Sequence, residues 1–451
     1  MKITLLLTTL LLSSLLFYLG YGLTEIPIYA VVPFIIMLLS IAILPLINGE
    51  WWHHNFPKVC LLIGAPMAFA VMAFNWEWLY HTTLEYIAFI ALLTSLFIIS
   101  GGILLKENLK ISPVVNSAIL LIGAVLASVI GTTGASMLLI RPTIRLNKGR
   151  KHKVHVIIFF IFIIANIGGS LTPLGDPPLF LGFLKGVPFF WTLKIFPVWL
   201  FNNAILIVLF FIIDSFLLSK ERTINIKELP KGKMLEIDGK INFLFLLGIV
   251  AGVIAYSELP EQMNPLIKDA IQIFIFGSMA ILSLKFTPKK YREKNGFTWF
   301  PIKEVAILFA AIFASMIPVL KLLELKGQSL GISEPWQFFW ATGALSSFLD
   351  NAPTYLTFLS TAKTVSIQFV AQGVPFIALK DGGMVAENLL LAISMGAVFM
   401  GANTYIGNGP NFMVKSIAEE ANIKMPSFFA YMLWSVLILI PLFILNTLLF
   451  I

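Results

Sequence analysis

A stretch rich in glycine and proline interrupts an apolar segment that begins near Val154 and resumes at Leu179. It reads NIGGSLTPLGDPP over Asn166–Pro178. Glycine weakens a helix, and proline removes a backbone donor and clashes with the preceding turn, so a continuous helix cannot form here. In lipid, such a break is tolerated only where protein or a water-filled cavity satisfies the freed backbone groups.

The same pattern returns near the C-terminus. GANTYIGNGP at Gly401–Pro410 aligns without a gap on GSLTPLGDPP at Gly169–Pro178, and this alignment places Asn408 on Asp176. Two broken membrane helices at corresponding positions of two halves indicate the binding site of a transporter. The alternative is a purely structural role, in which both breaks are kinks that help neighbouring helices to pack.

The composition places this 451-residue chain in a membrane. It is 58% hydrophobic and 12% charged, whereas a soluble protein is about half apolar and about one quarter charged. Apolar runs of about 20 residues recur, which predicts an all-α integral membrane protein rather than a barrel of short alternating strands. The net charge of +8 comes from Lys and Arg in the loops, so it orients the chain and does not indicate a nucleic-acid partner. The single Cys60 excludes an intramolecular disulfide and a multi-cysteine metal site.

Loop charge gives the expected orientation. The Asn75–Thr83 loop has Glu77 and no Lys or Arg, whereas the loop after Leu146 is strongly basic. We therefore expect a multi-pass protein of the bacterial cytoplasmic (inner) membrane with a cytoplasmic N-terminus. Basic residues flank both ends of 114–146, and a re-entrant hairpin places both ends on one side where a single spanning helix cannot.

Taken together, these segments predict about 11 transmembrane helices plus two re-entrant hairpins in an inverted-topology repeat with two broken helices. The expected units are an extra N-terminal helix at 1–25, a first repeat at 26–218, a cytoplasmic linker at 219–240 and a second repeat at 241–451. The expected hairpins span 114–146 and 336–369, and the expected broken helices span 154–190 and 388–417. Leu5–Leu19 resembles a signal peptide, but no convincing cleavage site follows it.

Polar residues gather at the two hairpin tips and the two breaks. The tips, GTTGAS at Gly131–Ser136 and DNAPT at Asp350–Thr354, align Thr132 on Asp350. An Asp near the middle of a membrane helix costs about 2.5–3.5 kcal/mol, so it is a functional candidate by default. A small hard cation needs oxygen ligands, including carbonyls freed where a helix unwinds. The candidate ligands are Asp350, Asn351, Asp176, Thr132, Thr133, Thr172, Thr404, Asn408, Ser136 and Thr354, with Na⁺ expected at Asp350, Asp176 and Asn351.

The two carboxylates favour a cation over an anion. Two Asp in one low-dielectric site repel each other, so protons and cations compete for them, which is the basis of cation/proton exchange. A carboxylate substrate would prefer a buried Arg, and the nearest, Arg141 and Arg145, belong to the basic loop. The N-termini of the half-helices carry a partial positive charge that can hold an anion, so an anionic substrate remains the alternative to a cation. We expect no cofactor beyond transported Na⁺ and H⁺.

Several of these residues also have structural interpretations. Asp176 and Asn408 fit N-caps of the half-helices that follow them, and small or hydroxyl residues often pack between membrane helices. We expect His155 to lie in a solvated loop and Asp214 to face the lipid headgroups. An intramembrane aspartyl protease needs two acids on facing helices, and Pro177 directly after Asp176 argues against it. We therefore expect a transporter and not an enzyme.

Four motifs carry a resemblance to a known family. They are GTTGASMLLIRP at Gly131–Pro142, NIGGSLTPLGDPPLFLGFLKGVPFFW at Asn166–Trp191, SSFLDNAP at Ser346–Pro353 and GANTYIGNGPNFMVK at Gly401–Lys415. With these motifs the chain resembles the ion transporter superfamily, and it is most similar to the branch of NhaD-type sodium/proton antiporters and ArsB-type arsenite permeases. Relatives in this branch are often labelled citrate transporters.

The resemblance implies a secondary transporter. Sodium/proton antiport is the leading expectation, Na⁺- or H⁺-coupled transport of citrate or another small organic anion is the alternative, and arsenite efflux is a third. It also implies a homodimer in the lipid bilayer, with a transport domain that moves as an elevator against a scaffold of early helices. The related dicarboxylate symporters carry Ser-Asn-Thr at both tips, where this chain has Gly131-Thr132-Thr133 and Asp350-Asn351-Ala352. This departure favours a cation site that contains an acid.

Overall fold

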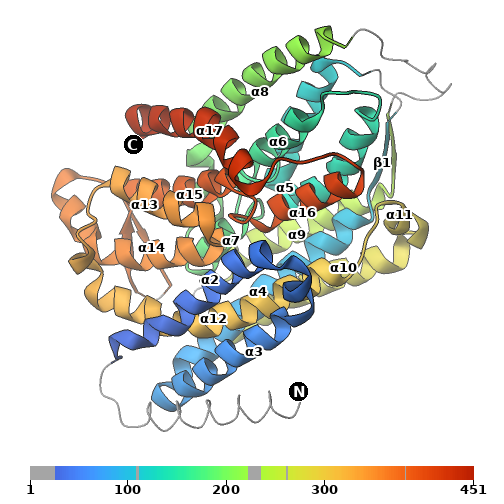
Figure 1. The fold of residues 1–451 in the computed structure, drawn as a ribbon. Helices are drawn as coiled ribbons and strands as arrows, with labels where there is room; N and C mark the ends of the chain where they lie inside the picture. Colours follow the sequence, from blue (N-terminus) through green and yellow to red (C-terminus); the bar gives the residue numbers. More distant parts are fainter. Residues whose placement is uncertain (1–25, 108–110, 222–234, 261–262, 381) are drawn as a thin grey trace.

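The computed structural model describes residues 26–107, 111–221, 235–260, 263–380 and 382–451 (Figure 1). Nine of the helices in this part of the chain are long and apolar enough to cross a membrane, and Ile241–Tyr256 is a shorter apolar helix. The protein is therefore a nearly all-helical, multi-pass membrane protein. The expected helix at 1–25 and most of the expected linker at 219–240 lie outside the described residues.

The early helices pack around a long helix from the second half. These elements are η1 (Ile28–Val31), α2 (Val32–Ile47), α3 (Gly49–Phe74), α4 (Trp76–Gly101) and α12 (Phe300–Lys326), which continues as η4 (Gly327–Leu330). Side chains of Asn48 and Asn75 cap α3 and α4 by accepting from backbone N–H groups of their first turns, which is why the chain turns sharply there. α12 packs on both α3 and α4 (Figure 1).

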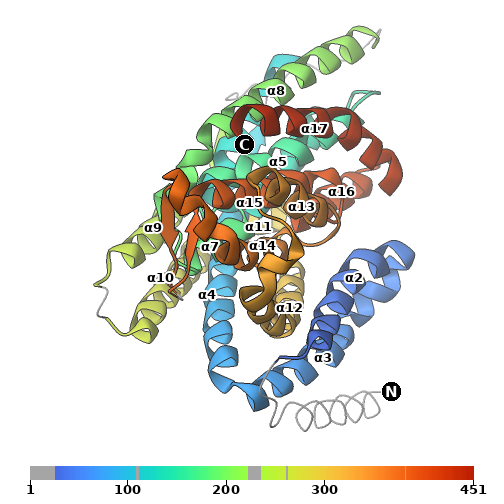
Figure 2. The same ribbon diagram turned by 90° about the vertical axis from the view of Figure 1, so that its left-hand side faces the viewer.

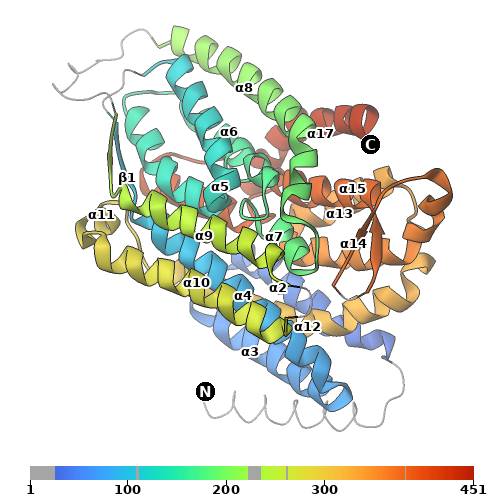
Figure 3. The ribbon, with the colours of Figure 1, turned by 180° about the vertical axis from the view of Figure 1, so that it is seen from behind.

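Other apolar helices belong neither to this group nor to the hairpins and breaks described below. They are α8 (Phe196–Ser219), which follows η3 (Phe189–Ile195), together with α9 (Ile241–Glu258), α10 (Pro265–Phe286) and α17 (Phe428–Phe450). α9 and α10 run side by side, and α10 also packs on α4 (Figure 3). The short α11 (Lys289–Lys294) connects α10 to α12.

Helix α5 (Pro113–Leu146) folds back on itself. A straight helix of 34 residues would be about 51 Å long. Instead, Asn116 near its start donates from Nδ2 to Oδ1 of Asn147, just beyond its end, at 3.1 Å. The reversal occurs at Gly131, whose φ of 80° and ψ of 152° are not helical. Glycine is suited to this position because a positive φ is strained for other residues.

A second helical hairpin lies in the other half of the chain. Its arms are α13 (Pro335–Phe348) and α14 (Asn351–Val365), with a non-helical turn between them. Its two ends are also close together, because Nε2 of Gln368 donates to the carbonyl of Ser333 at 2.8 Å. Each of these two segments is thus a pair of helices joined by a sharp turn.

Both expected breaks are present as well. The first comprises α6 (Val154–Ile163), η2 (Ile167–Leu171) and α7 (Pro177–Leu184), and the second comprises α15 (Glu387–Met400), η6 (Gly401–Asn403) and α16 (Gly409–Glu420). The first is almost fully enclosed by protein: 89% of Val154–Leu171 is buried, against 22% in the span of α10. Protein therefore surrounds its unwound backbone, as the physics of a bilayer requires. In Figure 2 the hairpin arms α13 and α14 lie beside α7 and α15.

The described residues also include two short two-stranded sheets. β1 (Leu104–Glu107) pairs antiparallel with β2 (Leu235–Asp238), with Leu104 opposite Asp238. After η5 (Ser366–Gln372), β3 (Phe376–Ala378) pairs antiparallel with β4 (Met384–Ala386), with Phe376 opposite Ala386. Backbone groups beyond the helix ends need partners, and these short strands provide them.

Candidate functional site

The first unwound segment ends at Asp176, directly before α7. The residue before a proline is disfavoured in the helical region, and Asp176 is extended, with φ −148° and ψ 143°. Asn408 holds the same position before α16, with φ −152° and ψ 140°. Each residue is the N-cap of its half-helix, yet neither side chain makes a capping hydrogen bond. Both side chains are instead turned to partners in other elements, which corrects the N-cap interpretation.

In each break the backbone makes a close contact with itself at a pair of glycines. A Cβ added to Gly175 would lie 1.9 Å from the carbonyl oxygen of Gly169, and one added to Gly407 would lie 2.5 Å from that of Gly401. Neither position has room for a side chain. The carbonyl of Gly175 also accepts from the backbone N–H of Thr132 at 2.8 Å, which joins the first break to the first hairpin tip.

One carboxylate is the meeting point of four elements. Asp176 is 1% exposed. Its Oδ1 accepts from Oγ1 of Thr132 at 2.9 Å and from Nδ2 of Asn408 at 3.2 Å, and its Oδ2 accepts from Nδ2 of Asn351 at 2.5 Å. Both hairpin tips and both breaks thus contribute a group. Burying a carboxylate is costly unless it is hydrogen-bonded, and these three donors stabilise it.

Asp350, the second expected acid, lies beside the hydrogen-bond partners of Asp176 and is not one of them. Asp350 is partly exposed, and its Oδ1 accepts from the N–H of Ala352 at 3.0 Å, so it caps α14. It lies within electrostatic reach of Asp176, but no hydrogen bond joins these two described residues. The structure therefore brings Asp176 and Asn351 together and leaves Asp350 beside them.

The threonines of the two breaks hold the backbone. Oγ1 of Thr172 donates to the carbonyl of Ser128 at 2.5 Å, and Oγ1 of Thr404 donates to the carbonyl of Ser347. The hydroxyl of Thr172 also accepts from the N–H of Leu174 at 3.1 Å. These hydroxyls join each unwound segment to its neighbouring hairpin, and their partners are backbone groups rather than Asp176.

The same contacts correct the alignment of the two tips. Oγ of Ser128 donates to the carbonyl of Gly168 at 2.5 Å, and Oγ of Ser347 donates to that of Met400 at 3.1 Å. Ser128 therefore corresponds to Ser347, and the equivalent of Thr132 is Asn351, one residue beyond the expected Asp350. Hydrogen bonds to the breaks set this register, and an alignment of residue types alone does not contain them.

The other three candidates differ in their environment. Thr133 is half-buried and lines the pocket beside Asp176. Ser136 lies one turn after Thr132 in α5, and its buried Oγ has no hydrogen-bond partner in the described part of the chain. Thr354 donates to the carbonyl of Asp350 at 2.9 Å, within the first turn of α14.

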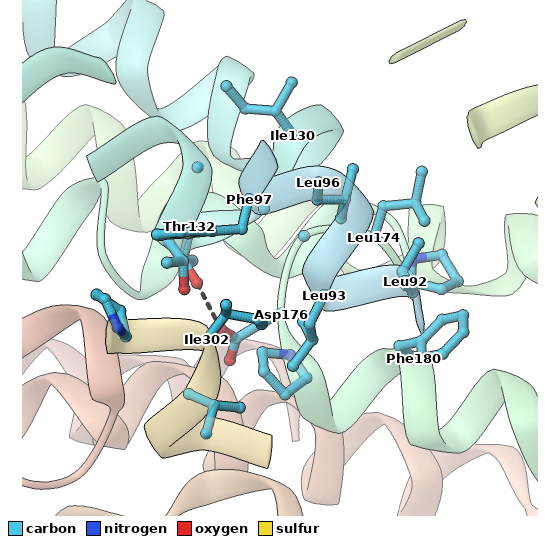
Figure 4. Close-up of a pocket in the computed structure, with 18 residues that line it drawn as sticks. Leu92, Leu93, Leu96, Phe97, Ile130, Thr132, Leu174, Asp176, Phe180 and Ile302 are labelled. Carbon is cyan, nitrogen blue, oxygen red and sulfur yellow. Dashed lines mark hydrogen bonds between the residues drawn. The ribbon is translucent and has the colours of Figure 1, made fainter. Parts of the chain in front are cut away.

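Asp176 faces a pocket between the first hairpin tip and helices α4, α7 and α12. It is small, with about 60 Å³ open to water, and its walls are mostly apolar side chains such as Leu92, Leu96 and Phe180. Figure 4 shows Thr132 joined to Asp176 at the polar side of this pocket, opposite Leu92 and Phe180. None of its 18 lining residues, all in the described part of the chain, is Lys, Arg or His.

Sequence reasoning missed two asparagines that join the breaks. Asn166 and Asn411 are both 0% exposed, and Nδ2 of Asn166 donates to Oδ1 of Asn411 at 2.7 Å. Oδ1 of Asn166 in turn accepts from Nδ2 of Asn408 at 3.3 Å. Each lies inside a motif that was singled out for its glycines and prolines. An amide within such an apolar segment is itself the signal that would have identified it.

Two expectations outside the site are wrong. Asp214 is 0% exposed and His155 is 2% exposed, so neither contacts headgroups or bulk water. Asp214 forms a buried ion pair with Arg150, and its Oδ1 lies 2.8 Å from Nε2 of His155. Its Oδ2 accepts from Nδ2 of Asn116 at 3.1 Å. The cluster fixes the base of the first hairpin to α8, and the burial of these charges arises only from tertiary packing.

Comparison with known proteins identifies a family for this chain. A model of the family described as "Putative citrate transport" matches residues 23–451. No curated protein matches the chain. The family match is consistent with the resemblance to the ion transporter superfamily, and it covers nearly the whole chain. The protein therefore belongs to this citrate-transport family of multi-pass membrane transporters.

Proposed function

We propose that this protein is a sodium/proton antiporter in which Na⁺ and H⁺ compete for Asp176. One observation carries the proposal: a fully buried carboxylate receives hydrogen bonds from both hairpin tips and from the second break. Such a carboxylate can hold either a proton or a hard cation. Asp350 adds negative charge nearby, which strengthens the competition.

The surroundings of Asp176 favour a cation. Its pocket is lined by apolar groups and hydroxyls, and among the described lining residues there is no side chain with a positive charge. An isolated organic anion would enter such a pocket at a high electrostatic cost. A sodium ion would instead gain the oxygens of Asp176, Asn351 and Thr132, with Thr133 close by at the pocket wall.

The proposal includes an architecture. We assign 1–25 to an extra helix, 26–218 and 241–451 to two inverted repeats, and 219–240 to a cytoplasmic linker. The hairpins then enter the bilayer without crossing it. The hairpins and broken helices would form the part that moves as an elevator against α3, α4 and α12, in a homodimer of the bacterial cytoplasmic membrane with the N-terminus inside. The tight joining of both breaks through Asn166 and Asn411 supports movement of these elements as one body.

Everted vesicles that contain a pH-sensitive dye provide the test. Addition of Na⁺ should dissipate a preformed proton gradient, and Asp176→Asn should abolish this response. The matched control is Asp269→Asn, which makes the same chemical change at a residue of α10 that accepts from Oη of Tyr256 at 2.8 Å. A wild-type protein that gives no Na⁺ response, or an Asp176→Asn variant that retains it, would refute the proposal.

The second candidate is cation-coupled citrate transport, which the family description favours. In this case Asp176 would bind the coupling ion, and citrate would be recognised together with a cation that offsets its charge. Labelled citrate uptake into cells that express the protein distinguishes the candidates. Uptake that depends on Na⁺ or on a proton gradient, without Na⁺/H⁺ exchange in vesicles, would replace the antiport proposal.

A further inference from the structure

Three lysines join the part of the protein that carries the site to the helices around it. The hairpins and broken helices, with β3 and β4 between them, are here called the site body. They supply Lys185 at the end of α7, Lys363 in α14 and Lys380 in the turn between β3 and β4. Helices α3, α4, α9, α10 and α12, here called the frame, supply the acceptors.

Two of these lysines lie side by side. Nζ of Lys185 donates to Oε1 of Glu85 in α4 at 2.8 Å, and both side chains are about one quarter exposed. The backbone N–H of Lys380 donates to the carbonyl of Lys185 at 2.8 Å, and its Nζ donates to Oη of Tyr256 in α9 at 2.8 Å. That hydroxyl donates onward to Oδ1 of Asp269 in α10 at 2.8 Å. The two lysines thereby connect the site body to three frame helices.

The third lysine shares its partner with the frame. Nζ of Lys363 donates to Oε1 of Glu324 in α12 at 2.7 Å, and Oε2 of the same carboxylate accepts from Nζ of Lys321, also in α12, at 2.8 Å. Lys321 keeps Glu324 paired when Lys363 moves away. The contact can therefore open without leaving an uncompensated charge in the frame, which would be costly.

These contacts lie at the end of the frame away from the pocket. Glu85 is about 10 Å along α4 from Leu92, where the pocket wall begins, and Glu324 is about 28 Å along α12 from Val305, where that wall ends. The charged contacts and the pocket thus occupy different levels of the same boundary.

The rest of this boundary is built differently. Phe89 of α4 stacks on Phe180 of α7, with ring centroids 6.4 Å apart. At the pocket end, Nη1 of Arg141 donates to the backbone carbonyl of Asn295 at 2.9 Å, so its partner there is neutral. Apolar contact is non-directional and permits sliding, whereas a charge-assisted hydrogen bond favours one position.

We infer that Lys185, Lys363 and Lys380 form a latch that holds the site body against the frame in the position of this structure, and that movement of the body requires these three contacts to open. The movement belongs to the proposed function, on which this inference rests. Partly exposed ion pairs are weak, so the loss of one should change the ratio of open to latched protein by about 2- to 5-fold.

Distances between two spin labels measure the position of the site body. Glu77→Cys in α4 and Gln372→Cys in η5, after α14, place one exposed label on each side of the boundary. The full-length protein carries Cys60→Ala, which removes its single cysteine. Spectra in lipid nanodiscs and potassium buffer give the ratio of a second distance to the latched one. Lys185→Gln or Lys363→Gln should raise this ratio by about 2- to 5-fold.

The variant in which all three lysines are glutamine should raise the ratio by about 10-fold or more, because distant pairs contribute independently. Lys194→Gln is the matched control. Nζ of Lys194 in η3 lies 2.6 Å from Oε1 of Glu387 in α15, so this ion pair joins two elements on the site-body side. Its loss should leave the ratio unchanged. A triple variant with the wild-type distribution, or a control that shifts as far as Lys185→Gln, would overturn the latch.

Glu85→Gln tests whether Lys185 acts through its frame partner. It should give the same shift as Lys185→Gln, and the double variant should shift little further, because both changes remove one contact. Two shifts that simply add would show that the ion pair is not what holds this part of the boundary.

Added KCl provides a test without substitution. Salt screens exposed ion pairs, so wild type should shift toward the second distance and the triple variant much less. Equal shifts would contradict the latch. These measurements contain no Na⁺ and so separate the two proposals. Shifted distances in a protein without Na⁺/H⁺ exchange refute antiport and leave the latch standing, whereas exchange with one fixed distance in every variant refutes the latch alone.

Discussion

The unwound segment of the first broken helix ends in a carboxylate, Asp176, and that of the second ends in an amide, Asn408. Their backbones are nearly the same: both residues are extended, both precede a half-helix and neither side chain caps it. Only the chemistry differs, and Asn408 donates to Asp176 across the site. Two similar backbone segments thus present one negative group and a matching donor, instead of two acids that repel each other.

The bases of the two hairpins also differ in charge, because one is held by an ion pair and the other by a neutral hydrogen bond. The first is held by a buried cluster in which Asp214 pairs with Arg150 and contacts His155 and Asn116. The second is held by a hydrogen bond from Gln368 to a backbone carbonyl. The two hairpins therefore resemble each other in backbone geometry, whereas their bases carry different charges. The first half contains both the central carboxylate and the ionised anchor.

The largest effect is expected from exchanging the two break residues. The double variant Asp176→Asn/Asn408→Asp retains one carboxylate and one amide on the same scaffold. Because the donors of Thr132 and Asn351 meet Asp176 and not Asn408, transport should fall to the level of vesicles without the protein. Dye-loaded vesicles measure this. Recovery of even a tenth of wild-type exchange would mean that the two positions are equivalent.

The hairpin bases should differ strongly in stability. Asp214→Asn leaves the buried Arg150 with only the longer ion pair from its Nε to Glu221 at 3.8 Å, and it should cost about 3 kcal/mol of unfolding free energy. Gln368→Ala removes one exposed hydrogen bond and should cost about 0.5–1 kcal/mol. Denaturant unfolding in detergent compares the two variants. Similar losses would show that the cluster is no stronger an anchor than the neutral bond.

Substitution of the break glycines should have the next largest effect. Gly175→Ala places a methyl group against the Gly169 carbonyl, and Gly407→Ala does so less severely against that of Gly401. We expect losses of about 1–3 kcal/mol, larger for Gly175→Ala. Gly409→Ala is the control, since an added Cβ there meets nothing within 4 Å. If Gly409→Ala lowered the unfolding temperature as much as the other two variants, the close backbone contacts at Gly175 and Gly407 would be contradicted.

The smallest effect concerns the two threonines. Thr172→Val and Thr404→Val each remove a hydroxyl that joins an unwound segment to its hairpin, and each should cost about 1 kcal/mol. The Na⁺ concentration for half-maximal exchange should stay unchanged, because these hydroxyls bond to backbone groups. A clear rise in either variant would identify that threonine as a cation ligand, as the sequence suggested.

The sequence predicted the elements of the site well, because glycine, proline and loop charge act locally. The breaks at Asn166–Pro178 and Gly401–Pro410 and the turns at Gly131 and Asp350 are all present. It predicted their side-chain contacts less well. Thr172 and Thr404 look like ligands by composition, yet their hydroxyls bond to backbone groups once the chain is folded. Asn166 lies in the first break, but its partners Asn408 and Asn411 are more than 240 positions away, and the local sequence does not specify such pairs.

The sequence by itself determined that this chain enters a membrane and where its helices must break, since apolar length and backbone chemistry depend on neighbouring residues alone. Tertiary structure decided which groups meet. Asn351 reaches Asp176 across 175 positions of the chain and Asn408 across 232 positions. Such contacts depend on how the two halves pack, and no local rule specifies that packing.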